Sequence, residues 1–291
     1  MPVRPSLQEI RWLSSAAKSP AQFRSFLRRS FRGEPLAVGL SVSSGFVHSG
    51  LIYIHTSTVV LTGSQPFHEL HLRVHQPVLI PRPETEEWAI RLSELLVPSK
   101  LALSRPLSIL DLGTGTGCIP LLLCHVWRPK GQVRAHGIDI NPAAVELANE
   151  NGAACGLSPD TFKAVQGNFL APNFPGNLPE NIAPPFDIVT SNPPYIPLDE
   201  YRELPASVAR YEDRGALLGG PTGLEFYRAI ARLTAKKGFL SPGAVVALEI
   251  GYNQADAVRN IMHASGFNTQ VWVDAWGKER TIIARRFVRV G

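Results

Sequence analysis

The chain is poor in the residues that build disulfide frameworks and membrane spans. Of its 291 residues, three are cysteines, Cys118, Cys124 and Cys155, and no two of them form a C-x-x-C pair. An odd, scattered set of cysteines indicates a reducing compartment and excludes a disulfide scaffold or a cysteine zinc site. No apolar run approaches the ~20 residues that cross a bilayer. We therefore expect no metal and no membrane association.

Charged residues are unevenly distributed. They make up 18% of the chain, with a net charge of +5. There is no dense Lys/Arg run, so direct nucleic-acid binding is not expected. Residues 37–64 contain no Asp, Glu, Lys or Arg, and we interpret 37–62 as an atypical uncharged insertion.

The residues before Gly33 have the opposite bias. Seven Arg or Lys residues accompany a single acid, Glu9, among several serines. This composition is typical of a transit peptide and predicts a mitochondrial matrix protein, with the cytoplasm as the alternative. A pair of basic helices at a domain start explains the same residues. The two interpretations are compatible for residues 1–36.

The remainder of the chain alternates between strand-like and helix-like patterns. Residues 63–81 predict a β-hairpin linker, and 82–291 predict one larger domain. Alternating strands and helices favour a doubly wound, mostly parallel α/β sheet. Expected strands are 107–110, 133–138, 162–166, 186–190, 244–249, 269–273 and 280–287; expected helices are 85–96, 119–127, 142–154, 224–233 and 254–264. The last two strands are expected to form an antiparallel edge.

A glycine-rich loop follows the first predicted strand of this domain. It reads Asp111-Leu112-Gly113-Thr114-Gly115-Thr116-Gly117, and its glycines let backbone N–H groups approach a ligand closely. Asp139 ends the next strand, where an acid can accept hydrogen bonds from both ribose hydroxyls of a nucleoside. Asp111 would repel a pyrophosphate but suits a cationic amino-acid group. Together they favour S-adenosylmethionine (SAM) over NAD.

Asn168 and Phe169 end the third strand of the domain. The Asn168 side chain can hydrogen-bond an adenine amino group, and Phe169 can pack on the ring. Turn chemistry alone explains the same residues. We take both as candidate cofactor residues.

The motif Asn192-Pro193-Pro194-Tyr195 interrupts a buried strand, because proline cannot continue a central ladder. A planar nitrogen is a poor nucleophile, and methylating it requires acceptors for both of its protons. The Asn192 side-chain oxygen and the Pro193 carbonyl can accept them, while Tyr195 can stack on the flat group. Asn192 therefore lies where it can meet both cofactor and substrate.

The chain resembles the HemK/PrmC-type release factor glutamine methyltransferases over residues 63–291. The resemblance rests on Val78-Leu79-Ile80-Pro81-Arg82-Pro83-Glu84-Thr85-Glu86, on Asp111 to Gly117, Asp139 and Asn192 to Tyr195, and on Ala216 to Gly220, Gly223-Leu224, Tyr227-Arg228 and Leu248 to Gly251. It implies a class I, Rossmann-like, SAM-dependent enzyme that methylates the glutamine of a Gly-Gly-Gln motif in a peptide-chain release factor. It also implies substrate contacts from Arg82, Pro83 and Glu84.

Two departures separate the chain from that family. The N-terminal helical domain is reduced to residues 6–36, and Asn168 and Thr222 each stand where the family often has Asp. Two alternatives stay open: a DNA or RNA adenine N6-methyltransferase, which the same motif suits, and a non-catalytic SAM-binding assembly protein. We expect a monomer, since no exposed apolar helix stands out.

Overall fold

The computed structural model describes residues 63–96, 105–128, 133–204 and 213–287. The basic region 1–36 and the uncharged segment 37–62 lie outside these residues. Within the described part the seven-stranded, mostly parallel sheet expected from the sequence is confirmed. Its spatial order is β5-β4-β3-β6-β7-β9-β8. The strands are β3 (Leu107–Leu112), β4 (Val133–Asp139), β5 (Phe162–Gln166), β6 (Phe186–Ser191), β7 (Leu240–Glu249), β8 (Phe267–Val273) and β9 (Glu279–Arg286).

The central strands are parallel, and helices lie in the crossovers from β3 to β4, from β4 to β5 and from β6 to β7. β3 pairs in parallel with both β4 and β6, and β6 with β7. β9 runs antiparallel to β7 and β8, which gives the expected antiparallel edge. In β3 and β6 five of the six residues are buried, as expected of strands covered on both faces.

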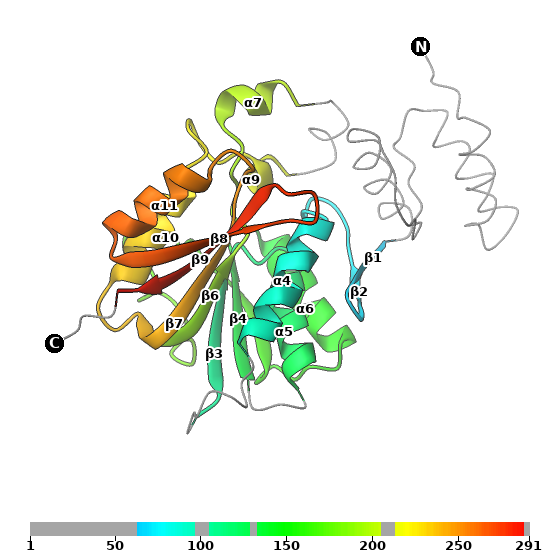
Figure 1. Cartoon of the computed structure of the whole chain (residues 1–291). Coiled ribbons are helices and arrows are strands. Elements are labelled where there is room, and N and C mark those ends of the chain that lie inside the picture. The colour runs from blue at the N-terminus through cyan, green and yellow to red at the C-terminus, as the bar shows by residue number, and fades with distance from the viewer. Residues whose placement is uncertain (1–62, 97–104, 129–132, 205–212, 288–291) are drawn as a thin grey trace, which may run out of the picture.

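Helices cover both faces of the sheet (Figure 1). The long helices are α4 (Pro83–Leu95), α5 (Cys118–Trp127), α6 (Pro142–Ala154), α10 (Glu225–Ala235) and α11 (Ala255–Ala264), and the short ones are α7 (Leu198–Arg202) and α9 (Arg214–Leu217). Residues of α4, α5 and α6 share one core with the sheet, and residues of α10 and α11 share a second core on the opposite face. Because both of its faces are buried, the sheet is a rigid base for its loops.

A small hairpin of β1 (Ser64–Phe67) and β2 (Leu70–Arg73) precedes α4. The fully buried Asn151 of α6 holds it, since Asn151 Oδ1 accepts from the Arg73 N–H at 2.7 Å and Nδ2 donates to the Arg73 carbonyl at 3.0 Å. Asn151 Nδ2 also donates to the Thr116 carbonyl at 3.0 Å. One side chain thus ties the hairpin to the glycine loop.

The strand order fixes where a ligand can bind. From β3 the chain winds outward through β4 and β5, then returns to β6 on the other side of β3. The loops after β3 and β6 therefore leave the sheet in opposite directions. In an open α/β sheet a ligand binds outside the carboxyl ends of the strands at such a switch point.

Candidate functional site

The glycine loop after β3 is held against β4 by its backbone. The N–H groups of Gly113 and Thr114 donate to the Ile138 carbonyl at 2.8 and 3.0 Å. Gly113, Gly115 and Gly117 have φ angles of 72°, 54° and 80°, in the left-handed region that favours glycine. A Cβ on Gly117 would lie 3.1 Å from Leu121, so this glycine also allows α5 to pack closely.

Asp139, at the carboxyl end of β4, joins this loop to the next turn. Its Oδ2 accepts from the Gly115 N–H at 2.9 Å, and its Oδ1 accepts from the Asn141 N–H at 2.9 Å. Burial raises the pKa of Asp139, against the effect of these hydrogen bonds. A carboxylate offers about four lone-pair positions, so Asp139 can hold the loop and still accept from two ribose hydroxyls.

Asp111, the last charged side chain of β3, is almost completely buried. It is 1% exposed, and its Oδ1 accepts from the Thr190 hydroxyl at 2.6 Å. Burial raises its pKa to about 6, although the Thr190 and Thr114 hydroxyls favour the ionised form. Its Oδ2 is buried, and no described residue donates to it with hydrogen-bond geometry. A buried carboxylate oxygen without a donor fits a cationic group such as the ammonium of SAM.

Asn168 and Phe169 take different positions at the end of β5. Asn168 is exposed, and its Oδ1 accepts from the Leu170 N–H at 2.9 Å, which is the turn chemistry considered above. Because that oxygen has two lone pairs, one remains for an adenine amine. Phe169 is half-buried against Phe226 of α10, with 5.9 Å between ring centroids. The two contacts to adenine stay predictions.

Asn192, Pro193, Pro194 and Tyr195 leave the sheet directly after β6. Asn192 is half-buried and Pro193 is buried. No backbone N–H of the described residues donates to the Pro193 carbonyl, so this acceptor is available. The half-buried Tyr195 packs against the second core, and its carbonyl accepts from Gln254 Nε2 at 2.9 Å. The motif is thus anchored through Tyr195, with its two acceptors in Asn192 and Pro193.

The candidate substrate residues Arg82, Pro83 and Glu84 lie at the start of α4. Arg82 is the N-cap residue and Pro83 occupies the first turn, a position that suits proline because its N–H would lack a partner there. Arg82 and Glu84 are half-buried and Pro83 is exposed. Their proposed contact with a protein substrate stays a prediction.

The next residue, Thr85, joins α4 to the site, and sequence reasoning gave it no role. Asn192 Nδ2 donates to the Thr85 hydroxyl at 3.2 Å, and this hydroxyl donates to Glu249 Oε2 at 2.6 Å. The Trp88 indole donates to the same oxygen at 2.9 Å. Glu249 was also given no role. Two features of the sequence could have drawn attention to these residues. Glu249 is an acid at the end of an otherwise apolar strand, and Thr85 follows Pro83-Glu84 at the start of a helix.

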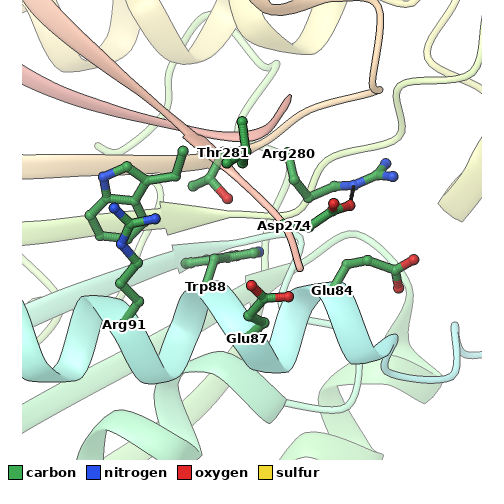
Figure 2. Close-up of a pocket in the computed structure, with 9 residues that line it drawn as sticks. Glu84, Glu87, Trp88, Arg91, Asp274, Arg280 and Thr281 are labelled. Carbon is green, nitrogen blue, oxygen red and sulfur yellow. Dashed lines mark hydrogen bonds and ion pairs between the residues drawn. The ribbon is translucent and has the colours of Figure 1, made fainter. Parts of the chain in front are cut away.

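Two hollows are found in the described part of the molecule, and the first shares Glu84 and Trp88 with the groups above. One, of about 10 Å³, is lined by Glu84, Glu87, Trp88, Arg91, Trp272, Val273, Asp274, Arg280 and Thr281. Figure 2 shows the Arg280–Asp274 ion pair on its far wall and α4 below it. That volume holds about one water molecule. The other hollow, about 270 Å³, adjoins Arg105, Ser108 and Arg134 near the amino ends of β3 and β4, at the sheet edge opposite the site.

The described residues contain no group of three or more His, Cys, Asp or Glu side chains that could hold a metal ion. The histidines His68, His71 and His75 are all exposed. None of the described helices combines the length and apolar character needed to cross a membrane.

The residues at the carboxyl edge fit SAM as a group. The Oδ2 atom of Asp111, which has no donor among the described residues, matches an ammonium. The open loop at Gly113 matches a carboxylate-bearing chain, and the lone pairs left on Asp139 match a ribose. At Gly113 an added Cβ would meet no atom within 4 Å, which leaves space above the loop.

Known proteins similar to this chain agree with this assignment. A family model described as a methyltransferase domain matches residues 103–280. The release factor glutamine methyltransferase of Moorella thermoacetica is 41% identical over 78% of this chain and 74% of its own length. That of Chlorobaculum tepidum is 37% identical over 74% and 69%. That of Thermodesulfovibrio yellowstonii is 37% identical over 78% and 75%.

Solved structures resemble the chain at lower identity and show the fold alone. The hMettl16 catalytic domain in complex with MAT2A 3′UTR hairpin 1 has a TM-score of 0.54 at 16% identity and covers 76% of each chain. A methyltransferase from Pyrococcus furiosus has a TM-score of 0.50 at 16% identity, covering 75% of this chain and 88% of that one. With SAM as its cofactor, the chain belongs to the release factor glutamine methyltransferase family.

Proposed function

We propose that the chain transfers a methyl group from SAM to the side-chain amide nitrogen of the glutamine in the Gly-Gly-Gln motif of a peptide-chain release factor. The observation that carries this proposal is the pair of acceptors in Asn192 and Pro193 at the switch point, beside the buried carboxylate of Asp111. The names of the relatives support the same substrate.

The acceptor pair is suited to a primary amide. Such a nitrogen carries two protons in one plane, and its lone pair is delocalised into the carbonyl. When Asn192 Oδ1 and the Pro193 carbonyl each accept one proton, the face of the nitrogen is presented to the methyl carbon. Alignment of this kind contributes about 7–11 kcal/mol to lowering a barrier. Pro193 and Pro194 restrict the backbone, so the two acceptors are aligned before the substrate arrives.

The remaining residues bind and orient rather than exchange protons. SAM, when bound, supplies an electrophilic methyl group on a sulfonium. Asp111 would bind its ammonium and Asp139 its ribose, and Tyr195 would limit access of water. As the nitrogen–carbon bond forms and the carbon–sulfur bond breaks, one amide proton is lost to water. The reaction needs no strong base, because the amide nitrogen becomes acidic once it is methylated and then gives up its proton readily.

Incubation with labelled SAM tests this function. A release factor should take up label, and its Gln→Ala variant at the Gly-Gly-Gln motif should not. Label on the variant, or label on DNA or RNA but not on the factor, would refute the proposal. The second outcome would favour the adenine methyltransferase alternative, and SAM binding without any transfer would favour the non-catalytic one. No feature of the described residues favours either alternative.

We further propose that the chain acts as a monomer in the mitochondrial matrix and does not bind nucleic acid directly. The Arg- and Ser-rich residues before Gly33 support the location. Import of the full chain into isolated mitochondria, with loss of import when residues 1–32 are deleted, tests it. Light scattering tests whether the chain is a monomer. A binding assay with a labelled RNA hairpin tests whether it binds nucleic acid.

A further inference from the structure

The side chain of Asn192 has two ends, and only one of them can serve the proposed reaction. Its Oδ1 atom accepts a proton from the substrate amide, whereas its Nδ2 group would meet that amide donor to donor. A 180° rotation of the amide would therefore abolish the acceptor pair. Something must determine which end faces the substrate.

The hydrogen bonds behind Asn192 have a fixed direction. An indole nitrogen can only donate, so Glu249 Oε2 accepts from Trp88 at 2.9 Å. The same oxygen accepts from the Thr85 hydroxyl at 2.6 Å. A hydroxyl has a single proton. With that proton donated to Glu249, Thr85 can only accept, and it accepts from Asn192 Nδ2 at 3.2 Å.

Because these side chains are buried, the direction of their hydrogen bonds cannot easily be reversed. Thr85, Trp88 and Glu249 are 1%, 3% and 2% exposed, so bulk water is not available to replace a lost partner. In the reversed orientation Asn192 Oδ1 would face the Thr85 oxygen with no proton between them. A buried acceptor without a donor is costly. Asn192 Nδ2 is therefore held toward Thr85, and Oδ1 is held away from it.

The four residues Asn192, Thr85, Trp88 and Glu249 belong to elements that the fold keeps together. Asn192 follows β6 and Glu249 ends the neighbouring β7, where Ser191 pairs with Leu248. Thr85 and Trp88 lie on α4, whose buried side is part of the first core. Helix α4 thus contacts the Asn192 amide through the Thr85 hydroxyl.

We propose that Thr85 and Glu249 are positioning residues that fix the orientation of the Asn192 amide, with Oδ1 turned toward the substrate glutamine. This proposal rests on the proposed function, since it needs an amide as the group to be bound. Neither residue touches substrate. Their contribution acts through Asn192 and is expected in turnover rather than in cofactor affinity.

Thr85→Val tests the proposal with little change in side-chain volume. Removing the hydroxyl deprives Asn192 Nδ2 of its acceptor, so we expect kcat to fall by about 10²-fold, as small misplacements of reacting groups do. The dissociation constant for SAM, measured by calorimetry, should be unchanged. Thr85→Ser keeps the hydroxyl and should retain most of the wild-type kcat. Equal kcat for wild type and Thr85→Val would overturn the proposal.

A double variant separates positioning from general structure. Once Asn192 has been replaced by Ala, Thr85→Val should cost nothing further in kcat. The same fold-loss in both backgrounds would show that Thr85 acts independently of Asn192, and would refute the proposal. If the proposed function itself were wrong, the wild-type enzyme would leave the release factor unlabelled. That result differs from a failure of the positioning proposal, in which the wild-type enzyme is active.

Glu249 provides a second pair of variants in case Thr85→Val does not fold. Glu249→Gln keeps an oxygen that can accept from both Thr85 and Trp88, so it should retain most of the wild-type kcat. Glu249→Met removes that acceptor and frees the Thr85 proton to turn toward Asn192, favouring the reversed amide. We expect a large loss of kcat at unchanged SAM affinity. Full activity in Glu249→Met would contradict the proposal.

Discussion

Replacing Asp111 with Asn should make the protein more stable and less able to bind SAM. Asp111 is 1% exposed, and burial raises its pKa from 3.8 to about 6. The folded state therefore favours the protonated carboxyl. At pH 7, where the side chain is ionised both folded and unfolded, a shift of about 2 units costs about 3 kcal/mol. Asn carries no charge and avoids this cost.

The sign of the pH dependence follows from the same shift. Below the unfolded pKa the carboxyl is protonated in both states and the cost disappears. As pH rises from about 4 to about 6, the unfolded chain loses its proton first, and stability falls. Without SAM, the variant should melt about 5–10 °C above wild type at pH 7. The two melting temperatures should converge toward pH 4.

SAM binding should change in the opposite direction. The variant lacks the buried negative charge that we propose binds the ammonium, so the expected loss is about 2–5 kcal/mol, or about 30- to 4,000-fold in dissociation constant. Wild-type affinity should also weaken below about pH 6, since binding requires the ionised carboxylate. Calorimetry measures the affinities, and scanning calorimetry the melting temperatures.

Asp187→Asn is a matched control with the opposite sign. Burial raises the pKa of Asp187, but hydrogen bonds from Arg105 at 2.7 and 2.8 Å and from the Ser108 N–H at 2.8 Å hold it below its ordinary value. This substitution should lower the melting temperature and leave SAM affinity unchanged. A variant of Asp111 that melts no higher than wild type at pH 7, or binds SAM equally well, would refute the reasoning.

Two further substitutions test how the site is held. Gly137→Ala would place a Cβ 2.6 Å from the Thr114 hydroxyl oxygen and should therefore displace the glycine loop. We expect it to lower the free energy of unfolding by about 1–3 kcal/mol and to weaken SAM binding in calorimetry. Unchanged SAM affinity would contradict this. Asn151→Ala removes bonds to Arg73 and Thr116 at 2.7–3.0 Å from a fully buried site. It should lower the free energy of unfolding in urea by about 3 kcal/mol, and a loss below about 1 kcal/mol would show that the hairpin is held otherwise.

The order and type of the main elements could be predicted because buried parallel strands leave a strong pattern. The helix Pro142–Ala154 and the strand Phe162–Gln166 have the expected bounds. β7 begins at Leu240, four residues before the expected start, because Pro242 and Gly243 interrupt the apolar pattern. A register shift between Phe186 and Ile188 accommodates the irregular stretch. Such a bulge depends on the neighbouring strand and leaves no local signal.

The short helices and the hydrogen bonds behind Asn192 could not be predicted for a related reason. α7 and α9 have five and four residues, too few to show a helical period. Thr85 and Glu249 are 164 residues apart in the chain. Their contact depends on how α4 docks on the sheet, which no local pattern encodes. Local motifs therefore pointed to Asn192 and Pro193 as candidate acceptors, whereas the contacts from which we infer the orientation of Asn192 are visible only in the folded structure.

The most direct test of the central claim is tandem mass spectrometry of a release factor after incubation with SAM and the enzyme. The account predicts one added methyl group on the side-chain nitrogen of the Gly-Gly-Gln glutamine. With Asn192→Ala, calorimetry should still show SAM binding, while the modified peptide should be almost absent. A methyl group on any other residue, or an equal yield from Asn192→Ala, would contradict the account.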